Sequence, residues 1–218
     1  MERVAIFDFD GTVIRGDSVV ALLLFARKRR IISFQTLIRA AWAGMRYRVG
    51  LCDALTAKRA SHAFLCSMPQ KKREAFLRDF AKTLADRAYP DAMAQIAAHK
   101  SAGDTVLLCS ASCSCYMRYA APLIGADALL CTPCAADGRV IGPNCRGEEK
   151  VRRVTAWRTE RNLSPDCICA AYGDSRGDAP ILRASAAPVL VNAKRGLKRL
   201  IPDARQVQWK EAKNARDR

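Results

Sequence analysis

Acidic residues and long apolar runs are both scarce in this sequence of 218 residues. Its 21 Asp and Glu residues are outnumbered by 37 Lys and Arg residues, which gives a formal net charge of +16. The apolar run VVALLLFA is cut off by RKRR, and it is far shorter than the roughly 20 residues that cross a bilayer. The sequence therefore argues against a transmembrane protein. The positive charge predicts attraction to nucleic acid, acidic lipid surfaces or phosphorylated small molecules.

A signal peptide is not expected, because the first Met leads directly into a predicted strand. A secreted disulfide scaffold is not expected despite 10 cysteines, which we interpret as reduced thiols of a cytoplasmic protein. No cysteine is followed by an arginine six positions later, which excludes a cysteine-based phosphatase. One alternative is a zinc site, with Cys131 and Cys134 joined by Cys113, Cys115 or Cys145 as ligands.

Short apolar runs alternate with helical stretches along most of the chain, which predicts an α/β fold with a parallel sheet. The expected strands are Val4–Phe7, Thr105–Cys109, Ile168–Tyr172, Pro188–Val191 and an edge strand in RQVQWK (205–210). Helices are expected over 91–101 and 149–162. The segment 129–142 resembles a hairpin, with its turn at Asp137-Gly138.

A long helical stretch without a convincing strand interrupts this alternation at residues 17–86. Its charge is lopsided, with 14 Lys or Arg residues against 5 Asp or Glu residues. We interpret it as an inserted cap domain. The core domain then comprises residues 1–16 and 87–210, and residues 211–218 form a flexible basic tail.

Carboxylates follow two of the predicted strands at the point where each strand ends. Asp8 and Asp10 come directly after the first strand, and residues two apart in an extended chain point the same way. Asp174 and Asp178 follow a later strand. Ligands of open α/β sheets bind at the carboxyl ends of the strands, and clustered carboxylates suit Mg²⁺. The pattern therefore predicts a magnesium site.

Groups suited to a phosphate dianion occur at the same predicted edge. Ser110 ends a third strand in a run of hydroxyl residues, and Lys150 lies near the start of a helix. A hydroxyl, a helix amino end and an ammonium group are typical phosphate-binding elements.

These residues, taken in order, resemble the four motifs of the haloacid dehalogenase superfamily. They are Asp8-Phe9-Asp10-Gly11-Thr12, then Ser110, then Lys150, then Gly173-Asp174-Ser175 with Asp178. The large insertion straight after the first motif resembles the phosphoserine-phosphatase-like subfamily IB. The resemblance covers nearly the whole chain. It implies a Rossmann-like parallel sheet with an inserted helical cap of the C1 type.

The resemblance also implies roles. Asp8 would attack phosphorus to form an aspartyl-phosphate, and Asp10 would protonate the leaving group and then activate water. Mg²⁺ would be held by Asp8, the Asp10 carbonyl and Asp174, with Asp178 in support. Lys150, the third catalytic candidate, would bind the transferring phosphoryl group together with Ser110. Further candidates for phosphate or substrate binding are Gly11, Thr12, Asp17 and Arg59, of which Arg59 is chosen for its position in the cap.

Several assignments stay open at this level. Arg146, just before Gly147-Glu148, is an alternative to Lys150 as the cation of the third motif. Asp17 stands where phosphoserine phosphatases carry a substrate-binding glutamate. Arg59 and His62 lie one helical turn apart in the cap and could reach substrate, although most such residues on a helix surface do nothing specific.

We therefore expect a cytoplasmic, Mg²⁺-dependent phosphomonoesterase that acts on a small phosphate ester. The alternative is a membrane-surface phosphatase of a lipid headgroup, such as a phosphatidylglycerophosphate-like substrate, because the cap is basic and carries apolar stretches. An anionic membrane surface is thus a possible partner. A non-catalytic nucleic-acid binder is a remote alternative, because an acidic cluster without metal would repel phosphate, and no nucleic acid is expected.

Overall fold

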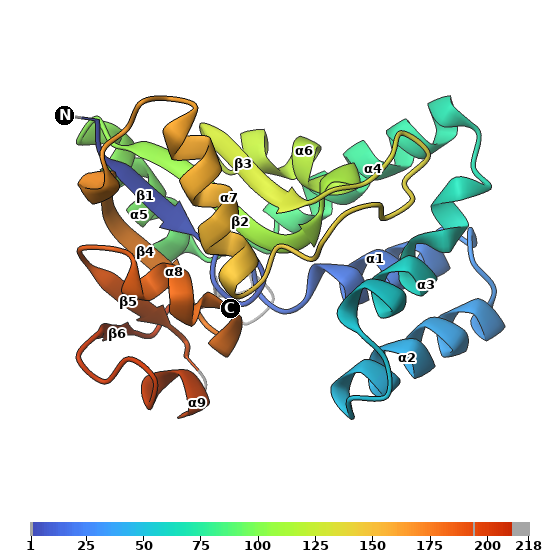
Figure 1. Cartoon of the computed structure of the whole chain (residues 1–218). Coiled ribbons are helices and arrows are strands. Elements are labelled where there is room, and N and C mark those ends of the chain that lie inside the picture. Colours follow the sequence, from blue (N-terminus) through green and yellow to red (C-terminus); the bar gives the residue numbers. More distant parts are fainter. Residues whose placement is uncertain (1, 194, 211–218) are drawn as a thin grey trace, which may run out of the picture.

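The computed structural model describes residues 2–193 and 195–210 and contains a six-stranded parallel sheet (Figure 1). The strand order is β3-β2-β1-β4-β5-β6. The strands are β1 (Val4–Phe7), β2 (Thr105–Cys113), β3 (Ala128–Thr132), β4 (Ile168–Gly173), β5 (Pro188–Val191) and β6 (Arg205–Val207). The predicted fold class is confirmed, and the predicted tail at 211–218 lies outside the described residues.

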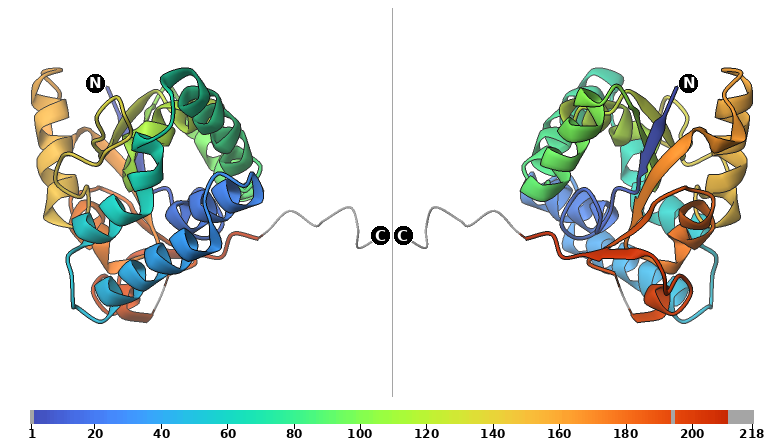
Figure 2. Two further views of the ribbon diagram at one scale, coloured as in Figure 1. Left: turned by 90° about the vertical axis from the view of Figure 1, so that its right-hand side faces the viewer. Right: turned by 90° about the vertical axis from the view of Figure 1, so that its left-hand side faces the viewer.

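Helices cover both faces of the sheet. Both faces carry apolar side chains, because successive side chains of each strand point to opposite faces. In β1, Ala5 and Phe7 join one apolar cluster, whereas Val4 and Ile6 join the other. α5 (Pro90–Ser101) and α6 (Ser114–Leu123) contribute to the first cluster. The second cluster includes residues of α7 (Glu148–Thr159), α8 (Ala179–Arg183) and α9 (Arg195–Lys198). Figure 2 shows the sheet between these two helical layers.

Four helices follow the first strand without any strand between them, as the sequence predicts for the cap. They are α1 (Ser18–Lys28), α2 (Phe34–Arg48), α3 (Ala54–Cys66) and α4 (Gln70–Ala85). The last of them returns to the core, where Phe80 packs edge-on against Tyr116 of α6 with ring centroids 5.3 Å apart. The domain division at 17–86 remains a prediction. None of the described helices is both long and apolar enough to span a membrane.

Two local expectations differ from the structure. Residues 128–132 form the parallel edge strand β3 instead of half a hairpin, and the turn at Asp137-Gly138 is closed by the single antiparallel bridge between Cys134 and Val140. β2 runs to Cys113, four residues beyond the predicted end, with a register shift against β3 between Ser110 and Cys113. This extension carries the hydroxyl residues of β2 beyond the end of β1.

Candidate active site

The ammonium group of Lys150 joins two carboxylates at the carboxyl edge of the sheet. Its Nζ donates 2.6 Å hydrogen bonds to Oδ1 of Asp8 and to Oδ1 of Asp178. Asp8 follows β1, and its backbone N–H donates to the carbonyl of Tyr172 in β4, which ties the two strand ends together. All three charged side chains are buried. Lys150 comes from the first turn of α7, so three separate segments meet here.

Asp174 completes a group of three carboxylates with Asp8 and Asp178, in which one oxygen atom from each residue lies within 4.8 Å of the other two. Its approach depends on Gly11, whose φ is +80°. A Cβ atom at position 11 would lie 2.6 Å from Oδ2 of Asp174, so any other residue there would displace this carboxylate. Gly11 therefore makes room for a carboxylate, which the sequence motif alone did not reveal.

The cluster carries more negative than positive charge, because one ammonium group faces three carboxylates. Burial and the neighbouring Asp178 raise the pKa of Asp8 well above its usual value. Burial opposes the charge of Lys150, but Asp178 and Asp8 outweigh it and hold its pKa well above the ordinary value. Three hard oxygen donors with unbalanced charge fit a divalent cation such as Mg²⁺.

The carboxylate of Asp10 lies in a second network, made of hydroxyl groups. Its Oδ2 accepts hydrogen bonds from Ser112 Oγ at 2.6 Å and Ser18 Oγ at 2.9 Å, and its Oδ1 accepts from the Ser18 N–H. Ser18 is also 2.8 Å from the hydroxyl of Tyr116. Burial and the nearby Asp17 raise the pKa of Asp10 to about 6, against the opposing hydrogen bonds. Asp10 can therefore hold a proton near neutral pH.

Ser110 lies in the extended part of β2, beside the start of α6. Its Oγ accepts a 3.0 Å hydrogen bond from the backbone N–H of Ser112, and its side chain is buried. The network around Asp10 was missed by the sequence reasoning. The run of hydroxyl residues at the end of β2 is visible in the sequence, but only the register of the folded strand shows which hydroxyl faces Asp10.

Lys58 of α3 reaches this same stretch of β2 from the cap. Its Nζ donates to the carbonyl of Ala111 and to Oδ1 of Asn144. Thr132 donates from its hydroxyl to the same two oxygen atoms, at 2.6 and 3.2 Å. Burial lowers the pKa of Lys58, although the charge of Asp10 opposes the shift. The sequence predicts a role for the next residue, Arg59, and not for Lys58, since no motif marks the cap position that faces the core.

Comparisons with known proteins show which family the chain is similar to. A sequence model described as "haloacid dehalogenase-like hydrolase" matches residues 5–183. The chain is 33% identical over 184 residues to protein CicA of Caulobacter vibrioides, which covers 81% of this chain and 80% of CicA. It is 26% identical to a histidinol-phosphatase of Neisseria meningitidis, over 96% of this chain and 97% of that protein.

The chain belongs to the haloacid dehalogenase-like hydrolase family. The expectation of an enzyme of this family is thereby confirmed. A crystal structure of a Bordetella pertussis protein of unknown function superposes with a TM-score of 0.86 at 25% identity, over 95% of this chain and 98% of that one. A phosphoserine phosphatase solved as a phospho-aspartyl intermediate analogue has the same fold, with a TM-score of 0.68 at 16% identity and coverage of 96% and 94%.

Three other site residues predicted from the sequence, Asp17, Thr12 and Arg146, differ in their burial and in their contacts. Asp17 is exposed and caps α1, because its Oδ1 accepts from the N–H groups of Val19 and Val20. Thr12 is fully buried, and its hydroxyl has no hydrogen-bond partner among the described residues. Arg146 is exposed and its side chain packs against Gly177, whereas Lys150 holds the contact with Asp8.

Arg59 points to the segment after β3 instead of the carboxylates. Its Nε donates a 3.3 Å hydrogen bond to the carbonyl of Val140, and it lines a cavity of about 560 Å³ together with His62 and Arg139. His62 is buried there, with Nδ1 2.8 Å from the carbonyl of Lys58. The structure therefore does not bring Arg59 into the group around Asp8.

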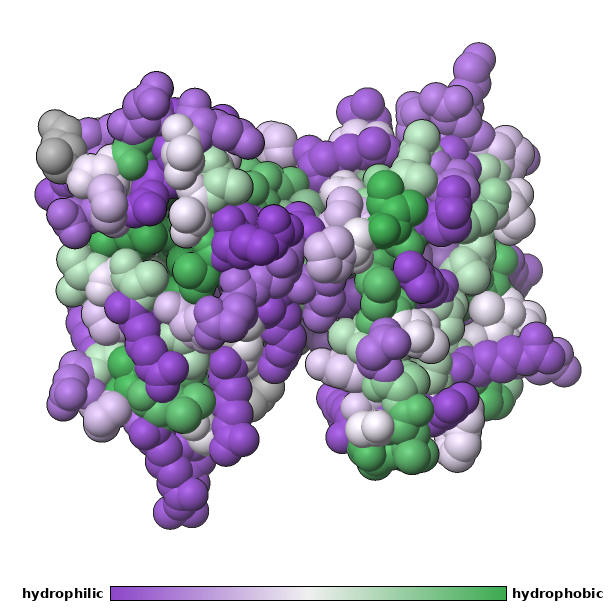
Figure 3. Space-filling model, in the orientation of Figure 1, coloured by the Kyte–Doolittle hydropathy of each residue, from purple (hydrophilic) through white to green (hydrophobic). Residues whose placement is uncertain are grey.

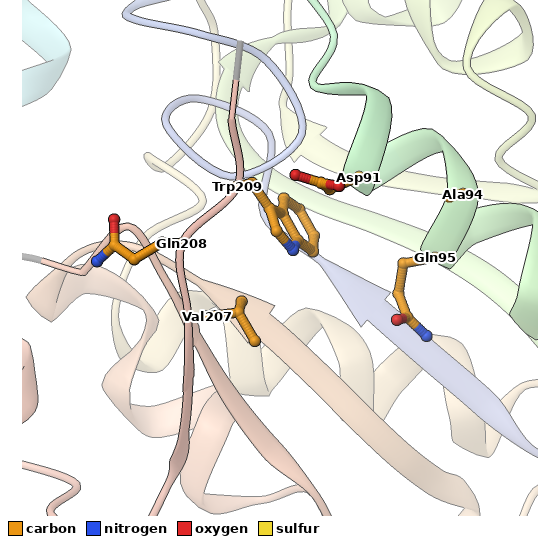
Figure 4. A pocket seen from close by; sticks show the side chains of 6 residues that line it. All are labelled: Asp91, Ala94, Gln95, Val207, Gln208 and Trp209. Carbon is orange, nitrogen blue, oxygen red and sulfur yellow. The ribbon is translucent and has the colours of Figure 1, made fainter. Parts of the chain in front are cut away.

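Two further features of this hydrolase lie outside the carboxylate cluster. A shallow cavity of about 510 Å³ between α5 and the segment after β6 is lined by residues that include Asp91, Gln95 and Trp209 (Figure 4). Elsewhere, His99, Asp104 and Cys169 place potential metal ligands within 4.8 Å. Two of these ligands are already paired, because Nδ1 of His99 lies 2.8 Å from Oδ2 of Asp104.

The alternative zinc site does not assemble from the cysteines. Within residues 2–193 and 195–210, the groups of three or more potential ligands are the two described above, and neither contains Cys131 or Cys134. All ten cysteines are free thiols. The carboxylate cluster is thus the group that fits a hard metal ion.

Proposed function

We propose that this hydrolase is a Mg²⁺-dependent phosphomonoesterase that works through an aspartyl-phosphate on Asp8. The observation that carries the proposal is the meeting of Asp8, Lys150, Asp174 and Asp178 at the edge of the sheet. One ammonium group and a metal-binding set of carboxylates surround a carboxylate that can serve as a nucleophile. The matching family and the phosphatases among its relatives support this assignment.

In the first step, an Asp8 carboxylate oxygen attacks phosphorus in line with the leaving group, and the bond between phosphorus and the ester oxygen breaks. Asp10 donates its proton to that oxygen, so the product alcohol leaves neutral. Its pKa of about 6 supports this role, because a fraction of the carboxyl groups is protonated near neutral pH. In the second step, Asp10 takes a proton from water, and the resulting attack on phosphorus releases phosphate and restores Asp8.

The transferring phosphoryl group needs positive and hydrogen-bonding partners throughout. Lys150 would neutralise one of its oxygen atoms, while the Ser110 hydroxyl and the N–H groups at the start of α6 would bind the others. Asp8, the Asp10 carbonyl and Asp174 would hold Mg²⁺, with Asp178 in support. When bound, this ion supplies charge neutralisation at the phosphoryl oxygens.

The substrate class is a small phosphate ester. A relative named histidinol-phosphatase and a structural neighbour that is a phosphoserine phosphatase both suggest an ester that carries an amino group. Asp17, exposed at the start of α1 beside Asp10, is the candidate carboxylate for such an amine, and Arg59 stays a candidate for specificity. Neither a lipid headgroup phosphatase nor a nucleic-acid binder finds support in the comparisons.

A substrate panel tests the proposal. It should contain histidinol phosphate, phosphoserine, glycerol phosphate, a water-soluble phosphatidylglycerophosphate and p-nitrophenyl phosphate, each with Mg²⁺ and with EDTA. We expect Mg²⁺-dependent release of phosphate from at least one small ester, and loss of that activity in Asp8→Asn. Activity that persists in EDTA, or in Asp8→Asn, would overturn the proposal.

A further inference from the structure

The outer face of α2 presents a stripe of large apolar side chains to solvent. Phe34, Ile38, Trp42, Met45 and Val49 are each more than half exposed. At about 100° per residue, these positions fall within an arc of about 80° on the helix surface. Figure 1 places α2 at the far side of the cap from the sheet, and Figure 3 shows hydrophobic residues gathered on that lobe.

The inner face of α2 carries mostly small residues. Ala40 is the buried residue of the helix, and Ala43, Gly44 and Leu37 are half-buried. A helix that served only to pack on the protein would turn its largest apolar groups inward. In α2 the small residues contact the protein and the large ones face outward, so its amphipathic pattern points to something outside the fold.

The segment that carries the stripe is basic along the chain. Between Ser18 and Cys52 the sequence has seven Lys or Arg residues and no Asp or Glu. On α2, Arg39 and Arg46 flank one side of the stripe and Arg48 flanks the other, by the same helical angles. None of these three arginines has an ion-pair partner in the part of the chain that the structure describes.

We infer that the outer face of α2 docks on an anionic lipid surface. The apolar stripe would enter the boundary between headgroups and acyl chains, with the helix parallel to the membrane plane. The flanking arginines would extend their charged ends to acidic headgroups while their carbon stems cover the apolar edge. The aromatic rings of Phe34 and Trp42 suit the same boundary. This docking does not depend on the proposed catalysis.

Charge favours a lipid surface over a second copy of this chain. A symmetric dimer through α2 would bring two basic segments together without an acidic residue between Ser18 and Cys52 on either copy. Anionic headgroups complement the whole surface at once, because they are mobile and can gather around each arginine. The stripe also lies on an outward helix face, which a broad planar surface can contact along its full length.

Sedimentation of the full chain with vesicles tests this inference. We compare vesicles of phosphatidylcholine alone with vesicles of phosphatidylcholine and phosphatidylglycerol, each at low and at physiological salt. We expect binding to the anionic vesicles only, weakened by salt. The double variant Trp42→Ser with Met45→Ser should lower the partition coefficient at least tenfold. Leu123→Ser, at a similarly exposed apolar residue of α6, should change it less than twofold.

Thermal melting and hydrolysis of p-nitrophenyl phosphate serve as controls for folding, because neither Trp42 nor Met45 belongs to the active site. Equal binding to neutral and anionic vesicles would overturn the inference, as would full binding by the double variant. Concentration-dependent dimerisation that the double variant abolishes, without vesicle binding by the parent, would assign the surface to a second copy instead. Binding of an acidic protein without vesicle binding would equally overturn it.

Discussion

The ammonium group of Lys150 lies 2.6 Å from the carboxylate of Asp8, although 142 residues separate them in the sequence. The two residues come from segments on either side of the cap insertion. Asp178, from a third segment, accepts a second hydrogen bond from Lys150. Lys150 is buried, so its charge is balanced by these carboxylates and not by water. Arg146, the alternative cation from the sequence, packs instead on Gly177.

Removing the buried cation should cost much more stability than removing the exposed one. Breaking a buried ion pair on one side leaves an uncompensated charge, which costs about 3 to 5 kcal/mol. Lys150→Met should lower the free energy of unfolding by about that amount, whereas Arg146→Met should change it by less than about 1 kcal/mol. Urea unfolding measures both. Equal losses in the two variants would contradict the assignment.

Removing the Ser112 hydroxyl should shift the pH dependence of the phosphorylation rate to higher pH. Asp10 must be protonated to act as the acid, so single-turnover phosphorylation by an alkyl ester should fall as pH rises through about 6. The Ser112 hydrogen bond lowers the pKa of Asp10. Ser112→Ala therefore raises that pKa, and the fall in phosphorylation rate shifts to higher pH.

Ser61→Ala is the matched control for this variant. Ser61 is also buried, but its hydroxyl donates to the carbonyl of Ala57, in the cap. In Ser61→Ala, the phosphorylation rate should fall over the same pH range as in the parent. If the phosphorylation rate of Ser112→Ala falls over the same pH range as in the parent, or over a lower one, Asp10 is not the titrating acid. With p-nitrophenyl phosphate, the phosphorylation rate should fall little with rising pH, because its leaving group needs little protonation.

Much of the core could be predicted because its signals are local. The end of β1 at Phe7 was predicted, and β4 ends at Gly173, one residue beyond the predicted Tyr172. Both follow from short apolar runs that stop at acidic residues, and parallel strands bring such ends to one edge. The contact of Lys58 with Ala111 depends on how the cap docks on the core, and no local pattern records that docking. The role of Ser112 depends on an irregular register in β2, which the alternation of residues does not reveal.

Mg²⁺ should stabilise the folded chain through the carboxylate cluster. At a free concentration one hundred times the Kd, one site adds about 2.7 kcal/mol, which raises the Tm of a chain of this size by about 5 to 10 °C. Asp174→Asn should abolish most of that rise, whereas Glu74→Gln on α4 should keep it. Scanning calorimetry with and without Mg²⁺ measures the shift. An unchanged shift in Asp174→Asn would place the ion elsewhere.

Lys58 should act on substrate binding through the cap. Its ammonium group holds α3 against the carbonyl of Ala111 and the side chain of Asn144. Lys58→Met should raise KM about tenfold or more for the preferred ester, with a smaller effect on kcat. Lys82→Met, at an exposed lysine of α4, should leave both constants within twofold. Equal falls in kcat for all esters with unchanged KM would contradict a binding role.

The covalent step on Asp8 is the central claim, and trapping the phosphorylated enzyme tests it most directly. Acid quenching during turnover of the preferred ester, followed by peptide mass spectrometry, should find one phosphoryl group on the peptide that contains Asp8. Asp8→Asn should carry none and should lose at least about a thousandfold in kcat, while its thermal melt remains cooperative. A phosphoryl group on another residue, or turnover with no trapped phosphoryl group at any quench time, would contradict the account.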